Sequence, residues 1–267
     1  MKRIAIVGAG GRMGRALIEE TLDTPGVELT VACDHSDHPA IGQDAGRYAG
    51  RADCGVKLTD ELANAINADV VIDFSAPAVT SELIELCAKH GVPLVSGTTG
   101  LEQSHHQALN AAAERIALLW APNMSVGVSL LCQLVAQATL VLGDEYDIEI
   151  VETHHRHKKD APSGTALRLA DVAAQASGGQ LDQRLQHGRQ GLQPRQSREI
   201  GIHAVRGGDV VGDHTVLFAC EGERIELVHR ASSRRTFSRG AVRAATWLIG
   251  RPCGRYQMQD VLSLPTR

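Results

Sequence analysis

GAGGRMG, residues 8–14, decides the fold of this chain, because it joins an apolar run to a helical pattern. The run before it, IAIV at 4–7, is short and contains β-branched residues, as is typical of a strand buried on both faces of a parallel sheet. After it, apolar residues recur at helical spacing until Pro25-Gly26, which precedes a second apolar run at 27–33. The stretch therefore predicts a strand, a glycine turn, a helix and a second strand.

The glycine turn is spaced as in a dinucleotide-binding loop, with one departure. A strict G-x-G-x-x-G pattern needs glycine at position 13, where this chain has Met13, whereas Gly8, Gly11 and Gly14 keep a regular spacing. Such glycines let the backbone approach a pyrophosphate, and the N–H groups of a helix N-terminus favour its charge. The second strand ends at Asp34, an acid placed to accept hydrogen bonds from an adenosine ribose. A plain turn in an ordinary α/β domain is the alternative, but the strand, helix and acid together favour a cofactor site.

Length and composition limit the class of protein. The chain has 267 residues, of which 43% are hydrophobic and 22% charged, so it can form one large domain or two smaller ones, and we expect two. A formal net charge of −4 and an aromatic content of 3% argue against a nucleic-acid partner. The N-terminus leads directly into a strand, and we expect no apolar stretch to reach the length of a bilayer. These features predict a cytoplasmic protein with no membrane partner, in which most of the six cysteines are buried thiols.

The alternation of strands and helices continues to residue 120. Further strands are predicted at 70–74, 92–96 and 116–120, with helices at 81–90 and 107–115. This alternation predicts an α/β fold with a Rossmann-like, doubly wound parallel sheet. A polar or glycine-rich loop follows each strand, at 75–77, 97–100 and 121–125. Because parallel sheets bind ligands at the carboxyl ends of their strands, these loops should lie beside the glycine turn.

After Ser125 the pattern changes to that of a second, α+β domain. The predicted elements are a long apolar helix at 126–142, strands at 146–151, 202–205, 210–218 and 225–229, and a long loop at 177–199. Strands that follow one another without helices predict a mixed or antiparallel sheet. A last helix, 241–249, is too short to form a domain and should pack on the first one. We therefore predict a dinucleotide-binding domain at 1–125, completed by 235–267, and a second domain at 126–234.

The densest polar block in the chain is ETHHRHKKDAPSGTAL, residues 152–167. A solvated charge run is one interpretation, although three histidines in four residues before a glycine turn are unusual for a plain surface. A metal site is another, because His155 and His157 would alternate onto one face of a strand. Arg156, Lys158 and Lys159 would repel a divalent cation, however, and no third ligand is evident. We therefore predict no metal, and an anionic substrate fits the block better.

The segment PSGT, residues 162–165, opens an amphipathic helix within this block. The backbone N–H groups of Gly164 and Thr165 can receive a carboxylate at that helix N-terminus. Histidine and lysine beside it offer proton donors whose pKa values an anion and a nearby cofactor could tune. A nucleotide crevice, a cationic carboxylate pocket and proton donors together predict a reductase of a small carboxylic acid.

A series of stretches spread over nearly the whole chain is similar to one known family. They are GAGGRMG (8–14), DFSAP (73–77), SGTTG (96–100), APNMSVGV (121–128), EIVETHHRHKKDAPSGTAL (149–167), IGIHAVRGGDVVGDHTVLF (200–218) and HRASSRRTFSRGAV (229–242). This set resembles 4-hydroxy-tetrahydrodipicolinate reductase, historically dihydrodipicolinate reductase. The resemblance implies a step of lysine and diaminopimelate synthesis, in which NADH or NADPH gives a hydride to a cyclic, unsaturated imine dicarboxylate after loss of water. It also implies a homotetramer assembled through the sheet of the domain at 126–234, which would bind the substrate.

The resemblance further assigns roles to single residues. His154 would be the general acid, and Lys158 a proton donor that also neutralises the substrate. His155 would bind a substrate carboxylate, held as well by the backbone N–H groups of Gly164 and Thr165. The pyrophosphate would contact Gly8, Ala9, Gly10, Gly11, Arg12 and Met13, and the nicotinamide side would be lined by Gly97, Thr98, Thr99, Ala121, Pro122, Asn123 and Met124.

Two residues depart from the pattern common in this family. Lys159 stands where many members have a smaller residue, and His35 follows Asp34 where arginine is common. Asp34 should favour the 2′-OH of NADH and repel a 2′-phosphate, for which a neutral His35 compensates little. We therefore expect a preference for NADH, with NADPH still accepted.

Two other functions compete with this interpretation. Another two-domain nicotinamide dehydrogenase would explain residues 1–125, but not why the cationic block and PSGT stand together. A non-catalytic sensor of nicotinamide nucleotides would bind the cofactor without turnover, and nothing in the sequence resembles an attached DNA-binding module. The reductase of a small dicarboxylate explains more of the chain than either.

Overall fold

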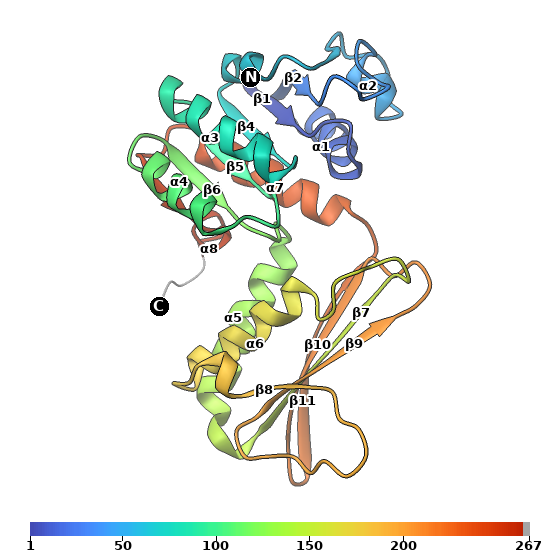
Figure 1. The fold of residues 1–267 in the computed structure, drawn as a ribbon, viewed down its shortest axis with the longest axis vertical. Coiled ribbons are helices and arrows are strands. Elements are labelled where there is room, and N and C mark those ends of the chain that lie inside the picture. Colours follow the sequence, from blue (N-terminus) through green and yellow to red (C-terminus); the bar gives the residue numbers. More distant parts are fainter. Residues whose placement is uncertain (264–267) are drawn as a thin grey trace. The chain divides into compact units, whose positions relative to one another are not determined.

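The computed structural model describes residues 1–263 and divides the chain into two compact units. Unit 1 consists of Met1–Val126 with Arg234–Arg267, and unit 2 of Gly127–Ser233. Each unit has its own sheet and its own hydrophobic core (Figure 1). A parallel sheet in one unit and a mixed sheet in the other confirm the predicted fold class.

Unit 1 is built on a seven-stranded parallel sheet in the order β12-β6-β5-β4-β1-β2-β3. The strands are β1 (Lys2–Val7), β2 (Val27–Cys33), β3 (Leu58–Thr59), β4 (Val70–Asp73), β5 (Leu94–Ser96), β6 (Ala117–Trp120) and β12 (Gly254–Tyr256). The direction of progression reverses between β1 and β4. In doubly wound sheets, this switch point is where ligands bind, beyond the carboxyl ends of the strands.

Helices cover both faces of this sheet. They are α1 (Arg12–Asp23), α2 (Ala45–Tyr48), η1 (Leu62–Asn67), α3 (Pro77–His90), α4 (Gln103–Ala113), α7 (Arg235–Leu248) and α8 (Met258–Val261). Alternate residues of β1 serve opposite faces, since Ile4 and Ile6 join the core cluster of α1 and α7. Ala5 and Val7 join the cluster of α3 and α4. A strand buried on both faces explains the continuous apolar run in the sequence.

Several elements of unit 1 differ from the sequence-based prediction. The strands β3 and β12 have only two and three residues, too few to show a period, and were missed. The helix α3 begins at Pro77 rather than at residue 81, because proline fits the first turn, where its missing N–H is harmless. The helix α7 begins at Arg235 rather than at 241, because Arg235 and Arg239 pair with Glu20 of α1. The first turns of α7 are therefore polar and lack the apolar period from which a helix can be predicted.

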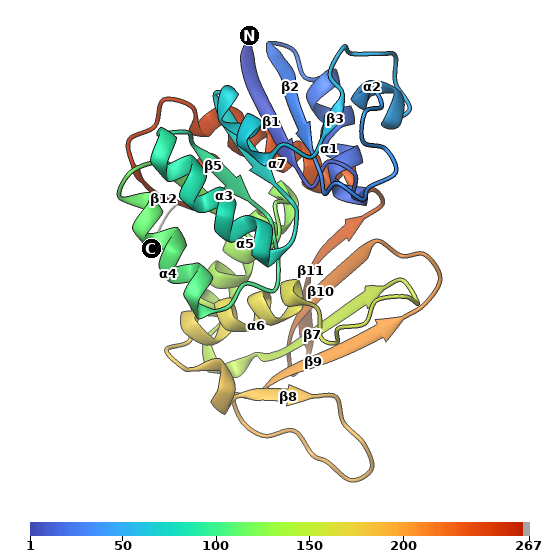
Figure 2. The same ribbon diagram turned by 45° about the horizontal axis from the view of Figure 1, so that its top comes forward.

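Unit 2 is built on a five-stranded mixed sheet in the order β11-β10-β7-β9-β8. The strands are β7 (Asp147–His154), β8 (Leu185–His187), β9 (Ile200–Arg206), β10 (Gly212–Cys220) and β11 (Glu223–Ala231). The strands β7, β9 and β8 run parallel to one another, whereas β10 is antiparallel to β7 and β11. Two helices, α5 (Val126–Leu142) and α6 (Gly164–Ala176), cover one face of this sheet (Figure 2), and η2 (Gly143–Glu145) and η3 (Leu181–Gln183) complete the unit.

The stretch 177–199, predicted as a loop, contains η3 and β8. Leu181 and Leu185 pack against the core of unit 2, and β8 pairs with β9. Three-residue elements bury too few side chains to give a readable period, which is why the prediction missed them.

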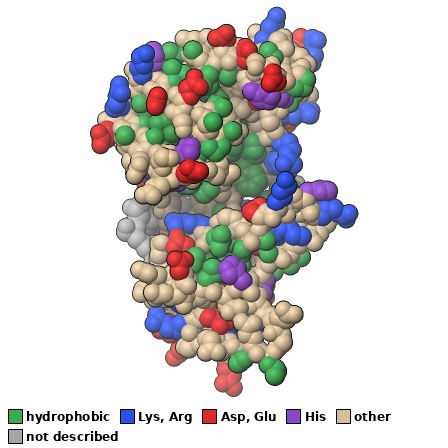
Figure 3. All heavy atoms as spheres, viewed as in Figure 1, with side chains coloured by type: hydrophobic (Ala, Val, Ile, Leu, Met, Phe, Trp, Pro, Cys, Tyr) green, Lys and Arg blue, Asp and Glu red, His purple; other side chains and the backbone are tan. Residues whose placement is uncertain are grey.

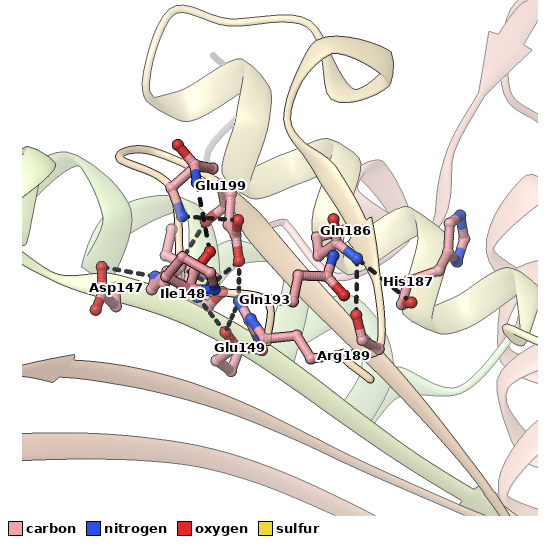
Figure 4. Close-up of polar contacts among 12 residues, drawn as sticks. Asp147, Ile148, Glu149, Gln186, His187, Arg189, Gln193 and Glu199 are labelled. Carbon is pink, nitrogen blue, oxygen red and sulfur yellow. Dashed lines mark hydrogen bonds and ion pairs between the residues drawn. The ribbon is translucent and has the colours of Figure 1, made fainter. Parts of the chain in front are cut away.

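The rest of this stretch is held to β7 by charged side chains (Figure 4). Glu149 of β7 pairs with Arg195, with Arg189 at 2.9 Å and with His203 Nε2 at 2.7 Å. Both arginines also pair with Glu199. Burial alone would raise the pKa of Glu149, but the hydrogen bonds from Arg189 and His203 and the charge of Arg195 leave the pKa below its ordinary value.

The helix α5 corrects the expectation that no apolar stretch reaches the length of a bilayer. Val126–Glu145, comprising α5 and η2, has 20 residues and a mean hydropathy of 1.8, so it is long and apolar enough by length and composition. The predicted end of the apolar run, Leu142, is the end of α5, and the span reaches 20 residues only when η2 is counted with it. Leu131 and Val135 of α5 nevertheless pack into the core of unit 2, as in a core helix.

Candidate functional site

The glycine turn after β1 leaves room only for glycine at its first and last positions. Gly8 has a φ of +81°, and a Cβ there would lie 2.4 Å from the carbonyl oxygen of Phe74. A Cβ on Gly14 would lie 2.1 Å from the carbonyl oxygen of Gly8. Gly14 therefore lets α1 pack closely on the turn, which is the task of the third glycine in a dinucleotide-binding loop. The departure at Met13 leaves this packing intact.

Three side chains fix Gly10 at the centre of the turn. Asp34 Oδ2 accepts a hydrogen bond from Gly10 N at 2.7 Å, and Tyr48 Oη donates to Gly10 O at 2.5 Å. The imidazole of His38 occupies the space that a side chain at Gly10 would need, because a Cβ built on Gly10 would lie 2.6 Å from His38 Nε2. Asp34 Oδ1 accepts from His35 N at 2.9 Å. The acid at the end of β2 thus orients the turn, and sequence reasoning missed His38 and Tyr48 because residues 37–60 show no motif.

A buried carboxylate joins the loops that follow β4 and β5. Asp73 has no exposed surface, and its Oδ2 accepts hydrogen bonds from Thr80 at 2.8 Å, Ser96 at 2.8 Å and Thr98 at 3.0 Å. Its Oδ1 accepts from the hydroxyl and the N–H of Ser75 at 2.5 and 3.1 Å. No ion pair to Asp73 occurs among residues 1–263. Hydroxyl groups and one backbone N–H therefore satisfy this charge and set the course of both loops.

The other expected cofactor residues lie on the same edge of the sheet. Gly97, Thr98 and Thr99 follow β5, and the segment 121–124 follows β6. Trp120 Nε1 donates to Thr98 O at 3.0 Å, which ties the two loops together. Because all strands of unit 1 are parallel, these loops and the glycine turn lie at one carboxyl edge, as expected for a site at the switch point.

In unit 2, a buried carboxylate holds the candidate general acid at the end of β7. His154 Nδ1 lies 2.6 Å from Oε2 of Glu152, which has no exposed surface. Arg206 of β9 donates to both carboxylate oxygens at 2.8 Å, and Ser163 N donates to Oε1 at 3.0 Å. Glu152 and His154 share a face because side chains alternate along a strand. Sequence reasoning missed Glu152 and Arg206, although the E-x-H spacing is readable in the sequence.

The opposite edge of His154 faces Gly212 and His214 of β10. A Cβ on Gly212 would lie 3.0 Å from His154 Nε2, so glycine leaves that nitrogen uncrowded. The rings of His154 and His214 pack edge to face, with their centroids 5.2 Å apart. His214 Nε2 lies 3.1 Å from the Oγ of Ser163. Burial lowers the pKa of His214 to about 4, and the charge of His154 adds to this effect.

Burial and charge act in opposite directions on the central pair. Burial lowers the pKa of His154, Glu152 works to raise it, and Lys158 and Arg206 lower it further, with a net decrease. Burial would raise the pKa of Glu152, but the bonds from Arg206, His154 and Ser163 leave it below its ordinary value. A neutral imidazole beside an ionised carboxylate results.

The residues after His154 form a cationic loop. The strand β7 ends at His154, so His155 and His157 lie in the loop and not on one strand face, as the weighed metal site required. Lys158 Nζ donates to Asp160 Oδ1 at 2.9 Å, and His155 Nδ1 is buried without a hydrogen-bond partner among the described residues. Figure 3 shows Lys, Arg and His side chains gathered over this end of the sheet of unit 2. Among residues 1–263, no group of three or more His, Cys, Asp or Glu side chains could hold a metal ion.

The helix α6 begins beside this loop, as the PSGT segment predicted. Ser163 is the N-cap, and its Oγ accepts a hydrogen bond from Ala166 N at 3.1 Å. Gly164 and Thr165 are the first two residues of the helix. The structure therefore brings His154, His155 and Lys158 to the same end of unit 2 as the N-terminus of α6. A helix N-terminus among cations suits an anionic ligand.

Comparison with known proteins agrees with these two halves. The sequence profile described as "Dihydrodipicolinate reductase, N-terminus" matches residues 2–124, and "Dihydrodipicolinate reductase, C-terminus" matches residues 127–262. A protein of Hahella chejuensis named 4-hydroxy-tetrahydrodipicolinate reductase is 50% identical over 266 residues, which cover 99% of this chain and 100% of that protein.

Solved structures give the same result. A dipicolinate-bound dihydrodipicolinate reductase from Paenisporosarcina sp. TG-14 has a TM-score of 0.75 and 26% identity, with 97% of this chain and 98% of that chain covered. GenD2 from gentamicin A biosynthesis, solved in complex with NAD, has a TM-score of 0.62 at 15% identity, with 98% and 90% covered, and so shares the fold. The coverage by both profiles and the 50% identity show that the chain belongs to the dihydrodipicolinate reductase family, a family of Rossmann-type oxidoreductases whose step lies in lysine and diaminopimelate biosynthesis.

Proposed function

We propose that this chain reduces 4-hydroxy-tetrahydrodipicolinate to tetrahydrodipicolinate, with loss of water and with NADH or NADPH as the reductant. Family membership supports the reaction, and one observation in the structure carries its assignment to particular residues. His154, paired with Glu152, lies at the same end of unit 2 as Lys158 and the N-terminus of α6. A proton donor, a cation and an anion-binding helix end are the groups that reduction of a carboxylated imine needs.

The chemistry adds one hydride and one proton to the unsaturated imine that is left when water departs. The nicotinamide, when bound, supplies the hydride and leaves oxidised. His154 takes up a proton from solvent on Nε2 and supplies that proton to the substrate, because Nδ1 is hydrogen-bonded to Glu152. Lys158 neutralises the charge that develops on the acceptor and is a second proton donor. Groups already aimed at this charge stabilise the transition state more than the ground state.

The substrate is a small dicarboxylate, and unit 2 offers donors for a carboxylate group. His155 Nδ1 is buried and lacks a partner among the described residues, so it can donate to a carboxylate oxygen. The backbone of Gly164 and Thr165 begins α6, where the helix dipole favours a negative charge. The relative from Paenisporosarcina sp. TG-14 binds dipicolinate, a pyridine dicarboxylate and thus a ligand of this chemical class.

The residues of unit 1 fit a nicotinamide dinucleotide. The close backbone packing at Gly8 and Gly14 and the start of α1 at Arg12 suit a pyrophosphate held by the turn from Gly8 to Met13. The loops at 97–99 and 121–124, at the same sheet edge, would hold the nicotinamide side. We propose that NADH is preferred over NADPH, because Asp34 presents a carboxylate at the end of β2 and His35 is a weak partner for a 2′-phosphate.

The assignment of roles to the two parts of the chain follows from these sites. Residues 1–125 with 235–267 would bind the dinucleotide, and residues 126–234 would bind the substrate and form a homotetramer in the cytoplasm. Among the described residues, the helices of unit 2 leave one face of its sheet uncovered, where Val151, Val205 and Val228 are 38, 46 and 45% exposed. Exposed valines on an uncovered sheet face suit burial against a second copy of the chain.

The decisive experiment is a coupled assay in which the unstable substrate is generated from pyruvate and aspartate semialdehyde by the synthase. We expect oxidation of the nicotinamide cofactor that depends on both precursors, with a higher kcat/KM for NADH than for NADPH. If NADH binds without being oxidised, the dinucleotide site stands and the assigned reaction is wrong. A substantially higher kcat/KM for NADPH at neutral pH would overturn the cofactor preference alone.

The oligomeric state is tested by light scattering after size-exclusion chromatography. We expect a tetramer for the native chain and smaller species for Val151→Lys, which places a charge in the uncovered sheet face. Leu22→Lys, on an exposed apolar residue of α1 in unit 1, is the control and should leave the assembly intact. A native monomer would contradict the assignment.

A further inference from the structure

We propose that Glu152, clamped by Arg206, is the positioning residue of the reaction: it keeps a proton of His154 on Nδ1, so that Nε2 is the nitrogen that takes up a proton from solvent and then delivers it to the substrate. The inference rests on the proposed role of His154 as the general acid. It adds to that role a carboxylate and a guanidinium that contact neither substrate nor cofactor but decide which imidazole nitrogen works.

The geometry around Glu152 leaves only one arrangement of hydrogens. Both carboxylate oxygens are acceptors, and they already receive Arg206 Nη1 and Nη2 at 2.8 Å and Ser163 N at 3.0 Å. The remaining contact, 2.6 Å from Oε2 to His154 Nδ1, therefore requires a hydrogen on Nδ1. The lone pair of a neutral His154 then lies on Nε2, the nitrogen that a Cβ on Gly212 would crowd at 3.0 Å.

Arg206 has a separate task, because a carboxylate alone would hold the proton too strongly. Without Arg206, the buried carboxylate would raise the pKa of the imidazolium and so make it a weaker acid toward the substrate. The fork of Arg206 supplies the balancing charge from β9 and is itself anchored, since Nη2 also donates to the carbonyl oxygen of Asp160 at 2.7 Å. The charged and titratable groups that face His154 are Glu152 on its own strand, Lys158 in the following loop, Arg206 on β9 and His214 on β10.

The same carboxylate connects the acid to the anion-binding helix. Glu152 Oε1 accepts the N–H of Ser163, and Ser163 is the N-cap of α6. The side chain of Ser163 also lies within hydrogen-bond distance of His214. One buried side chain thus sets both the nitrogen that gives the proton and the start of the helix proposed to hold a substrate carboxylate.

The test is Glu152→Gln, with the tautomer of His154 read from the ¹⁵N shifts of its ring in long-range ¹H–¹⁵N spectra. A glutamine keeps its oxygen toward Ser163 N and Arg206 Nη2, so its NH2 group faces His154 Nδ1. We expect the ring proton to move to Nε2, kcat to fall by roughly 10²–10⁴-fold and the KM for NADH to change little. The alkaline limb of the kcat profile, where the imidazolium loses its proton, should move to lower pH, since the imidazolium has lost its carboxylate.

The matched control is Glu149→Gln on the same strand. Glu149 also has arginine and histidine partners, but it lies on the other face of β7 and lacks contact with His154. It should alter stability and leave both the tautomer of His154 and kcat as they are. An equal loss of kcat in both variants would reduce Glu152 to a structural role and overturn the inference, as would an unchanged tautomer in Glu152→Gln.

A second variant decides the matter should Glu152→Gln fail to fold. Arg206→Gln keeps an amide donor but removes the balancing charge, so the alkaline limb should move to higher pH, opposite to the effect of Glu152→Gln. No shift, or a shift to lower pH, would overturn the inference. Failure of the proposed function gives a different result, because the native chain would then not oxidise NADH in the coupled assay, while the tautomer of His154 would still respond to Glu152→Gln.

Discussion

Among the described residues, each unit has one carboxylate with no exposed surface, and the two lie in opposite chemical surroundings. Asp73 of unit 1 and Glu152 of unit 2 are both fully buried. Asp73 is satisfied by serine and threonine hydroxyls and one backbone N–H, whereas Glu152 is satisfied by an arginine fork, a histidine and a backbone N–H. Serine and threonine hydroxyls do not titrate near neutral pH, so the hydrogen bonds around Asp73 do not change with pH in this range. The arrangement around Glu152 contains a titratable ring and can take part in proton transfer.

The largest effect should separate the chemistry of unit 2 from its architecture. His154→Gln removes the proposed acid and should lower kcat by roughly 10²–10⁴-fold with a modest change in KM, because general acid catalysis acts in the transition state. Lys158→Ala should impair both kcat and KM, since Lys158 also neutralises the bound substrate. Steady-state kinetics with the coupled assay check both. Near-normal turnover by His154→Gln would leave this residue with a structural or binding role only.

The next effect concerns the hydroxyl-bound carboxylate of unit 1. Asp73→Asn turns an acceptor into a donor among groups that need an acceptor, and should lower the free energy of unfolding by about 1–3 kcal/mol. Because Asp73 shapes the loops at 75–77 and 97–100, the KM for NADH should rise more than kcat falls. Urea unfolding and kinetics measure these changes. Asp69→Asn, which breaks an exposed pair with Arg3, is the control and should cost less than about 1 kcal/mol.

A smaller effect should appear in the dependence of stability on pH. The pKa of His214 is lowered by burial to about 4, while an unfolded histidine titrates near 6.5. Between these values the unfolded chain binds a proton that the folded chain does not, so stability falls as pH falls from about 6.5 towards 4. Urea unfolding at several pH values should show this slope, and His214→Asn should reduce it. An unchanged slope in the variant would mean that other groups carry the effect.

The smallest effect should come from a third carboxylate, Asp34. Unlike Asp73 and Glu152, which are fully buried, it has 11% of its side chain exposed. It accepts two backbone N–H groups and borders the place expected for the ribose. His35→Arg should raise kcat/KM for NADPH by roughly 10-fold through attraction to the 2′-phosphate, with little change for NADH. His90→Arg, at the end of α3, offers a control for added charge in unit 1. Equal changes with both cofactors would contradict a contact at this position.

The sequence predicted most of what periodicity and motif spacing can reveal. The apolar run at 4–7, the glycine turn and the alternation of strands and helices to residue 120 predicted the parallel sheet. The strands after residue 200, which follow one another without helices between them, predicted the mixed sheet. It could not reveal β3, β8 or β12, which have two or three residues each and are defined by pairing with distant strands.

The sequence revealed the site residues that lie within a short motif, because motif spacing can be read along the chain. His38, Tyr48, Arg206 and His214 were missed because they reach the site through tertiary contacts. Asp73 was visible as the end of a strand, but its five hydrogen bonds come from residues up to 25 positions away. A buried polar network depends on packing, which a single sequence does not display.

The late position of α7 in the chain bears on biosynthesis at the ribosome. The core cluster that α1 shares with β1 includes Ala241, Val242 and Leu248 of α7, which are translated after the whole of unit 2. Unit 2 is continuous and can close its core as soon as residue 233 has left the exit tunnel. The earlier-made strands of unit 1 must wait with one sheet face uncovered. Nascent chains halted when residue 233 has just left the exit tunnel should therefore expose that face to chaperones while unit 2 already resists proteolysis.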